Sequence, residues 1–106
     1  MLSKKDMKRG VIALLNNIYD PEIPVSIYAL GLIYDISFSE VEYGYSCVIT
    51  MTLTSPSCPV ADSLLDQVYN ISYMIEEIQK MRVDVVFEPP WNSSMMSEEA
   101  RLELDL

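Results

Sequence analysis

Cys58 is the residue whose type and position most directly suggest chemistry. Proline is favoured at the first position of a helix, so Pro59 predicts a helix with Cys58 at its N-cap. A thiol in that place feels the positive end of the helix dipole and unpaired backbone N–H groups. Both favour the thiolate, which binds soft metals or attacks electrophiles. A cysteine at a cap can also be a small buried apolar residue, so the motif alone leaves both interpretations open.

Further metal ligands would have to come from outside the Cys58 motif, because one cysteine cannot complete a tetrahedral metal site. Asp20 and Glu22 flank Pro21 in a predicted loop, where two carboxylates could come together. A second subunit or a partner protein could also supply ligands. A turn that only ends the preceding helix is the competing interpretation of Asp20 and Pro21.

The composition excludes several classes of protein. The 106 residues include no His, which excludes Cys/His zinc sites and His-based catalytic triads. The net charge is −9 and no Lys or Arg occurs from Gly10 to Gln79, so we expect no nucleic-acid binding. The apolar runs are too short to span a membrane, and no secretory signal is visible. We therefore expect a cytoplasmic protein with reduced thiols.

The stretch from Tyr45 to Thr54 shows the clearest alternation in the chain. Its odd-numbered residues, Cys47 among them, are apolar or aromatic, so we expect them in the core. Its even-numbered residues, Thr52 among them, are mostly polar and should form the other face of the sheet.

The elements that must position these residues follow an α-β-β-α-β order. They are a helix capped by Ser3 and ended by residues 20–22, strands at 31–39 and 45–54, a helix from Pro59 to Ile75 and a strand at 83–88. Residues 40–44 and 76–80 should be turns, and Ser97 should cap a short helix through Leu102. We expect an α/β (α+β) fold in a single domain over residues 1–106. It would be a three-stranded mixed sheet with helices on one face and a short C-terminal helical tail.

Pro89, Pro90 and Trp91 end the last predicted strand with two prolines and the only Trp of the chain. An exposed aromatic residue beside prolines is suited to docking a partner. The same residues could instead pin the C-terminal tail over the sheet. Both roles remain open at this point.

Four ordered motifs, residues 20–24, 30–36, 51–59 and 83–91, resemble the iron–sulfur assembly family of SufT- and PaaD-like proteins. This family also includes the eukaryotic cytosolic iron–sulfur targeting subunit. Met96-Ser97 and Glu99-Ala100-Arg101 match the family's ending, so the resemblance covers nearly the whole chain.

The resemblance implies a metal–sulfur cluster biosynthesis factor, as in the SUF system, that assists delivery of cluster or iron to client apo-proteins. Cys58 would be the reactive cysteine, and Asp20 and Glu22 the acidic loop residues. The partners would be an iron–sulfur scaffold and the clients. The alternative is an accessory subunit of a multicomponent oxygenase, or a thiol-dependent enzyme with Cys58 as nucleophile. A self-contained enzyme is disfavoured, because the chain has no His and no Lys within 20 residues of Cys58.

The cargo would be a transient iron–sulfur cluster or iron. With one available thiolate, we expect the isolated monomer to bind no cluster tightly, so a cluster would bridge two chains, as in a homodimer, or be transient. If both helices pack on one face of the sheet, the loops holding Asp20 and Cys58 can meet at one sheet end. They would then form a mixed oxygen and sulfur site suited to holding iron briefly.

Overall fold

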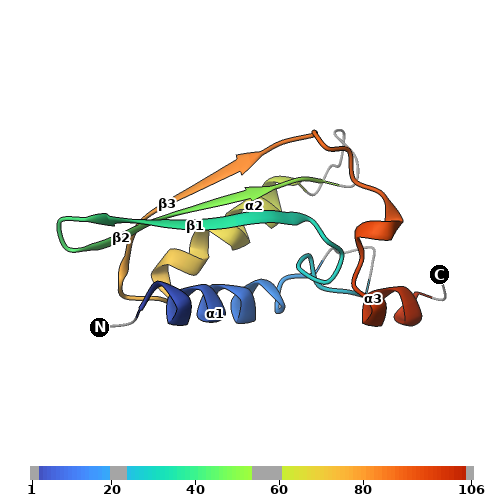
Figure 1. Cartoon of the computed structure of the whole chain (residues 1–106), viewed down its shortest axis with the longest axis horizontal. Coiled ribbons are helices and arrows are strands. Elements are labelled where there is room, and N and C mark those ends of the chain that lie inside the picture. The colour runs from blue at the N-terminus through green and yellow to red at the C-terminus, as the bar shows by residue number, and fades with distance from the viewer. Residues whose placement is uncertain (1–2, 20–23, 54–60, 105–106) are drawn as a thin grey trace.

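The computed structural model describes residues 3–19, 24–53 and 61–104. Three strands form one sheet in the order β1-β2-β3, with β1 and β2 antiparallel and β2 and β3 parallel. Helices α1 and α2 lie on the same face of this sheet, and α3 lies beyond its end (Figure 1). The elements are α1 (Lys4–Leu15), β1 (Ile33–Val41), β2 (Gly44–Met51), α2 (Ala61–Tyr69), the 3₁₀ helix η1 (Asn70–Tyr73), β3 (Ile78–Val85), the 3₁₀ helix η2 (Ser93–Met95) and α3 (Glu98–Glu103). The predicted fold class is confirmed. In the described parts of the chain, no helix is long and apolar enough to cross a membrane.

Helix α1 begins as the sequence predicts but ends earlier. The Ser3 hydroxyl accepts a hydrogen bond from the Asp6 N–H at 3.1 Å, which caps the first turn. The helix ends at Leu15 rather than at residues 20–22. Asn16 and Asn17 follow, and asparagine is a poor helix former. The Asn16 side chain instead accepts a hydrogen bond from the Ser26 hydroxyl at 3.0 Å, which ties the helix end to the following loop.

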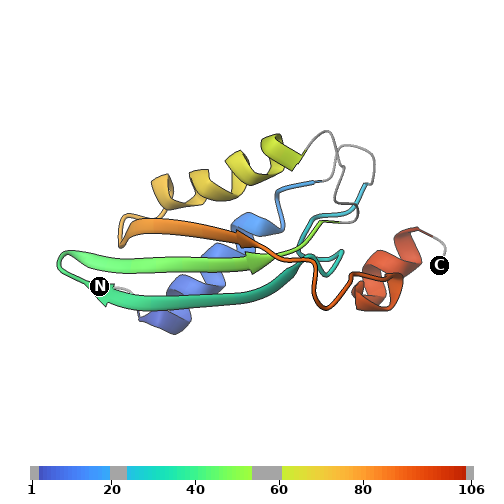
Figure 2. The same ribbon diagram turned by 90° about the horizontal axis from the view of Figure 1, so that it is seen from above.

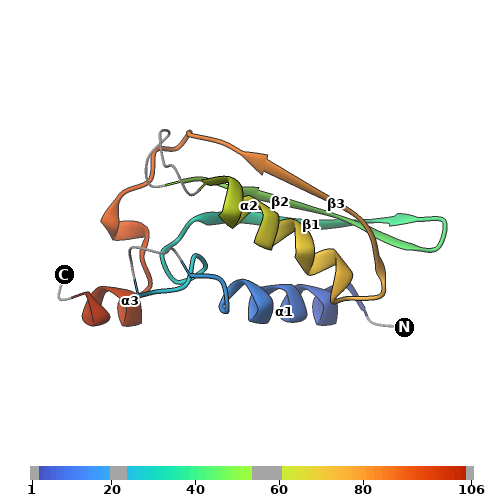
Figure 3. The same cartoon turned by 180° about the vertical axis from the view of Figure 1, so that it is seen from behind.

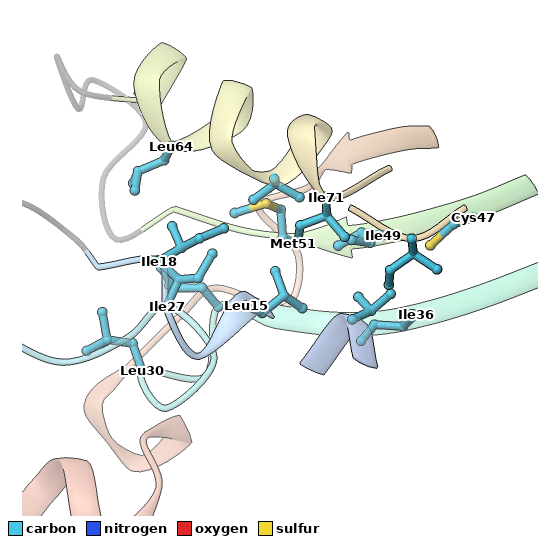
Figure 4. Close-up of a cluster of buried hydrophobic side chains, with 14 of the residues drawn as sticks. Leu15, Ile18, Ile27, Leu30, Ile36, Cys47, Ile49, Met51, Leu64 and Ile71 are labelled. Carbon is cyan, nitrogen blue, oxygen red and sulfur yellow. The ribbon is translucent and has the colours of Figure 1, made fainter. Parts of the chain in front are cut away.

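The core lies between the sheet and its two covering helices (Figure 4). Cys47, Ile49 and Met51 of β2 are fully buried, which confirms the predicted inward face of this strand. Leu64 of α2 and Ile71 of η1 meet them from the helix layer. Burying side chains of this size contributes about 1.5–3 kcal/mol each, so this layer dominates the stability of the fold. Burial also raises the pKa of the Cys47 thiol to about 11.

Thr52 departs from the predicted polar face. Ser46, Val48 and Thr50 are half-buried as expected, but Thr52 is only 1% exposed. It lies just beyond the end of β2, where its N–H donates to the carbonyl of Leu32 at 2.8 Å. Its hydroxyl has no hydrogen-bond partner among the residues that the structure describes.

Strand β3 begins five residues earlier than the alternation of residues 83–88 predicts. It runs over Ile78–Val85, so residues 78–80 are strand rather than turn. The pattern misleads because β3 is an edge strand, where charged residues such as Lys80 and Arg82 are tolerated on the outer side. A register shift opposite Tyr45 and Ser46 also interrupts the alternation.

The C-terminal helix matches the sequence prediction closely. The Ser97 hydroxyl accepts a hydrogen bond from the Ala100 N–H at 3.1 Å and so caps α3. The Ser97 N–H donates to the carbonyl of Ala29 at 2.8 Å, and Ala100 is buried. The tail is therefore docked against the loop that precedes β1.

Candidate functional site

Three chain segments meet at one end of the sheet. Met51 of β2 pairs with Ile33 of β1 on one side and with Val85 of β3 on the other. The Val86 N–H donates to the Met51 carbonyl at 2.8 Å, which extends this junction by one residue. We call the region around Ile33, Met51 and Val85 the strand end; β2 and β3 lead out of the sheet here and β1 enters it (Figure 2).

The residues predicted to carry chemistry fall in two segments that lie outside the described residues. Cys58 belongs to the cysteine segment, residues 54–60, and Asp20 and Glu22 belong to the acidic segment, residues 20–23. The structure describes the residues on both sides of each segment.

A relay of three backbone hydrogen bonds connects the residues that precede the two segments. Ile18, two residues before the acidic segment, accepts from the Ile27 N–H at 2.8 Å. Ile27 accepts from the Leu32 N–H at 3.2 Å, and Leu32 accepts from the Thr52 N–H at 2.8 Å. Thr52 lies two residues before the cysteine segment, and all four residues are buried. The relay holds the chain entering both segments at the strand end.

Among the described residues, few basic side chains lie near the strand end. Lys80 and Arg82 of β3 pair with Ser46 and Val48, toward the hairpin, and Arg82 forms an exposed ion pair with Asp84 at 2.8 Å. At about 3.3 Å per residue, Lys80 lies about 16 Å along the strand from the strand end. Lys80 is therefore too distant to serve as a general base there. Within residues 3–19, 24–53 and 61–104, no three Cys, Asp or Glu side chains gather as a metal site.

Trp91 fastens the chain that follows β3. Its indole N–H donates to the carbonyl of Leu30 at 2.7 Å, and its ring packs against the core. This contact supports the pinning role that the sequence left open. Pro89 and Pro90 beside it are exposed, and the Glu88–Pro89 peptide bond is cis. A docking role for these residues stays a prediction.

The structure identifies two further residues at the strand end, Tyr34 and Gly31, that were not predicted as site residues from the sequence. Tyr34 is the extra residue of a β-bulge, because Ile33 and Asp35 pair with the adjacent residues Met51 and Thr50. Its hydroxyl donates to the Pro89 carbonyl at 2.7 Å. Gly31 has a φ of +80°, and a Cβ there would collide with the Met95 carbonyl. Gly31, just before β1, was the one sign in the sequence of an irregular backbone here. The bulge itself does not interrupt the alternation of side chains along the predicted strand.

Comparisons with known proteins agree with this fold. The family model described as iron–sulfur cluster assembly protein matches residues 8–85. A Porphyromonas gingivalis protein named Fe-S protein maturation auxiliary factor is 43% identical over 92% of this chain and 90% of its own length. Fe-S protein maturation auxiliary factor SufT of Staphylococcus aureus is 38% identical over 82% of this chain and 96% of its own.

A solved structure gives the same result for the fold. The crystal structure of a domain of unknown function from Bacillus anthracis matches with a TM-score of 0.83 at 35% identity. The match covers 96% of this chain and 94% of that one. The resemblance seen in the four sequence motifs is confirmed by these matches. The chain belongs to the iron–sulfur cluster assembly protein family.

Proposed function

We propose that the chain is an iron–sulfur protein maturation factor that assists delivery of cluster or iron to client apo-proteins in the cytoplasm. The observation that carries this proposal is family membership over most of the chain, with relatives named as maturation auxiliary factors. The partners on this proposal are an iron–sulfur scaffold and the client apo-proteins.

The Cys58 thiolate, aided by Asp20 and Glu22, handles the cargo on this proposal. Support comes from the backbone relay, which holds the residues preceding both segments at the strand end. Further support comes from α2, whose first described residue is Ala61, because a helix N-terminus close along the chain favours a thiolate. Thiolate sulfur together with carboxylate oxygen gives a mixed ligand set that can bind iron.

The same arrangement supports a carrier or helper in preference to an enzyme. A nucleophilic cysteine needs a base to activate it, and the chain contains no His. The described lysines lie on β3 and on the first half of α1, away from the strand end. The thiol therefore serves as a ligand, with the remaining ligands supplied by the scaffold or the client.

Pro89 and Pro90 contribute an exposed docking surface beside the strand end. Two hydrogen bonds that hold this segment in place support the role. The Trp91 indole N–H donates to the Leu30 carbonyl, and the Tyr34 hydroxyl donates to the Pro89 carbonyl. A rigid, exposed segment next to the site would place a client or scaffold close to the cargo.

Substitution of Cys58 tests the function. In cells that lack the chain, Cys58→Ser should fail to restore the activity of cluster-dependent enzymes, because serine cannot replace a thiolate ligand. The matched control is Cys47→Ala, which alters the buried thiol and should restore activity. Full restoration by Cys58→Ser would overturn the ligand role. A folded Cys58→Ser protein, checked by circular dichroism, is required for either conclusion.

Anaerobic reconstitution with iron and sulfide tests the cargo side. The isolated monomer should hold no stable cluster, because the proposed site supplies one thiolate. Visible absorption measured together with molar mass gives the answer. A stable cluster on a strict monomer would contradict the proposal that the remaining ligands come from a partner.

A further inference from the structure

The helix side of the molecule carries opposite charges at its two ends. The first half of α1 presents four exposed basic side chains against one exposed acidic one: Lys4, Lys5, Lys8 and Arg9, with Asp6. Helix α3 presents three exposed carboxylates against one guanidinium: Glu98, Glu99 and Glu103, with Arg101. Both helices lie along the same side of the molecule, toward opposite ends of its long axis (Figures 1 and 3).

The acidic end continues onto the residues that follow α1. Glu99 and Glu103 of α3 line a shallow cleft together with Asn16 and Tyr19, which follow the end of α1. Tyr19 is exposed beside these carboxylates. The acidic end of α3 therefore adjoins the C-terminal end of α1, whose first half carries the basic side chains.

An uncharged groove lies between these ends. It has a volume of about 390 Å³ and separates α1 from α2 and η1. Its lining contains three amides and four apolar side chains: Asn17, Gln67 and Asn70, with Leu14, Ile18, Ile71 and Met74. Met74 is 65% exposed at its rim. A large apolar side chain exposed beside an apolar groove is typical of an interaction surface.

We propose that this basic–apolar–acidic face binds a second copy of the chain across a two-fold axis. A two-fold axis that lies in the plane of the interface and runs across the groove, perpendicular to the long axis of the molecule, aligns the two copies in opposite directions. Each copy's Lys5 and Arg9 region then meets the other's Glu99 and Glu103 region, and the two grooves face each other. A chain with a net charge of −9 repels its own copies in general, so the basic end is what makes self-association favourable here.

The size of the face is adequate for a dimer. The molecule measures 45 × 26 × 23 Å, and the face follows its 45 Å axis. A standard interface needs about 800 Å² from each partner, which a face of this length and width can provide. The groove would form the apolar centre and the charged ends the polar rim.

This dimer has a consequence for the cargo. The strand end lies toward the α3 end of the molecule, so the two-fold axis places the two strand ends at opposite ends of the dimer (Figure 1). A cluster therefore does not bridge the two copies within it. This point alone rests on the proposed function, and it assigns the remaining ligands to the scaffold or client rather than to the second copy.

Charge reversal combined with mixing tests the interface. Lys5→Glu with Arg9→Glu makes both ends acidic, and Glu99→Lys with Glu103→Lys makes both ends basic. Each double variant should be monomeric by sedimentation velocity at low salt, where the wild type is dimeric. An equimolar mixture of the two should dimerise again, because both end contacts regain opposite charges. Added salt should weaken the wild-type and the mixed dimer alike.

Two controls make the result specific. Lys80→Glu with Arg82→Glu changes the net charge as much as the α1 variant, but on the outer side of β3, and should leave the dimer intact. Met74→Asp places a charge in the groove and should give a monomer. A wild type that is monomeric at every concentration overturns the proposal. So does a dimer that survives the α1 and Met74 changes, because that dimer would use another face. None of these readouts depends on cluster delivery.

Discussion

The two ends of the sheet are built differently. At the hairpin end, β1 and β2 pair without a break from Val41 opposite Gly44 to Ile36 opposite Ile49. At the strand end, the same pair contains the Tyr34 bulge, preceded by Gly31 in a left-handed conformation. Thr52 lies there with a buried hydroxyl that has no partner among the described residues.

This difference indicates that the hairpin half of the sheet supplies stability, whereas the strand end positions functional groups. The regular half needs only alternation and a short turn, and it buries Ile49 and Cys47 completely. The strand end has an irregular backbone and a buried hydroxyl without a partner among the described residues, and both features cost stability. Departures of this kind gather where a protein positions functional groups, in agreement with the site proposed at the strand end.

The largest expected effect is in the regular half. Ile49→Ala should lower the free energy of unfolding by about 2–5 kcal/mol, because it leaves a cavity at a fully buried position. Urea denaturation measures the loss. Thr50→Ala, next to it on the outer face and half-buried, should cost well under half as much. Equal losses at the two positions would contradict the assignment of the faces.

The Cys47 thiol should make stability depend on alkaline pH. Its pKa is raised from 9.0 to about 11 in the folded state. Between these values the unfolded chain loses the thiol proton and the folded chain keeps it, so stability falls as pH rises through this range. The loss approaches about 2–3 kcal/mol at pH 11. Denaturation of the wild type and of Cys47→Ala at pH 8 and 10.5 isolates this contribution; parallel curves would contradict it.

The same burial predicts the reactivity of the thiols. Cys47 should resist iodoacetamide until the protein unfolds, whereas Cys58 should react in the native state. Mass spectrometry after brief labelling distinguishes the two. Equal labelling in the native protein would show that the inward face of β2 opens readily, or that Cys58 is not exposed.

Gly31 should be intolerant of a side chain. Gly31→Ala should cost about 1–3 kcal/mol, because φ is +80° and the new Cβ collides with the Met95 carbonyl. Gly10→Ala is the matched control within α1, where a Cβ would lie 3.5 Å from the Ile75 side chain. That change should stabilise the helix by about 0.5–1 kcal/mol. Thermal unfolding of both variants should therefore shift in opposite directions.

The smallest expected effect is at Thr52. Thr52→Val keeps the shape and removes a buried hydroxyl that has no partner among the described residues, so stability should stay the same or rise by up to about 1 kcal/mol. Thr50→Val, in the half-buried position beside it, serves as the reference. A loss of more than about 1 kcal/mol on Thr52→Val alone would mean that the hydroxyl has a partner in the folded chain.

Local signals in the sequence determined several parts of this protein. Ser3 and Ser97 cap their helices as predicted, because capping involves only three or four neighbouring residues. The inward face of β2, including Cys47, follows directly from alternation in a central strand. The order of elements and the family resemblance also follow from the sequence, whereas the roles of Cys58, Asp20 and Glu22 remain proposals.

Only the tertiary structure decided the rest. The end of α1 at Leu15 depends on the Asn16 bond to Ser26, and the start of β3 at Ile78 depends on pairing with β2. The relay that holds the residues preceding both segments at the strand end depends on the bond between Thr52 and Leu32, which are twenty residues apart in the chain. Contacts between residues so distant in sequence leave no periodic mark, because each is set by how the elements pack and not by its neighbours.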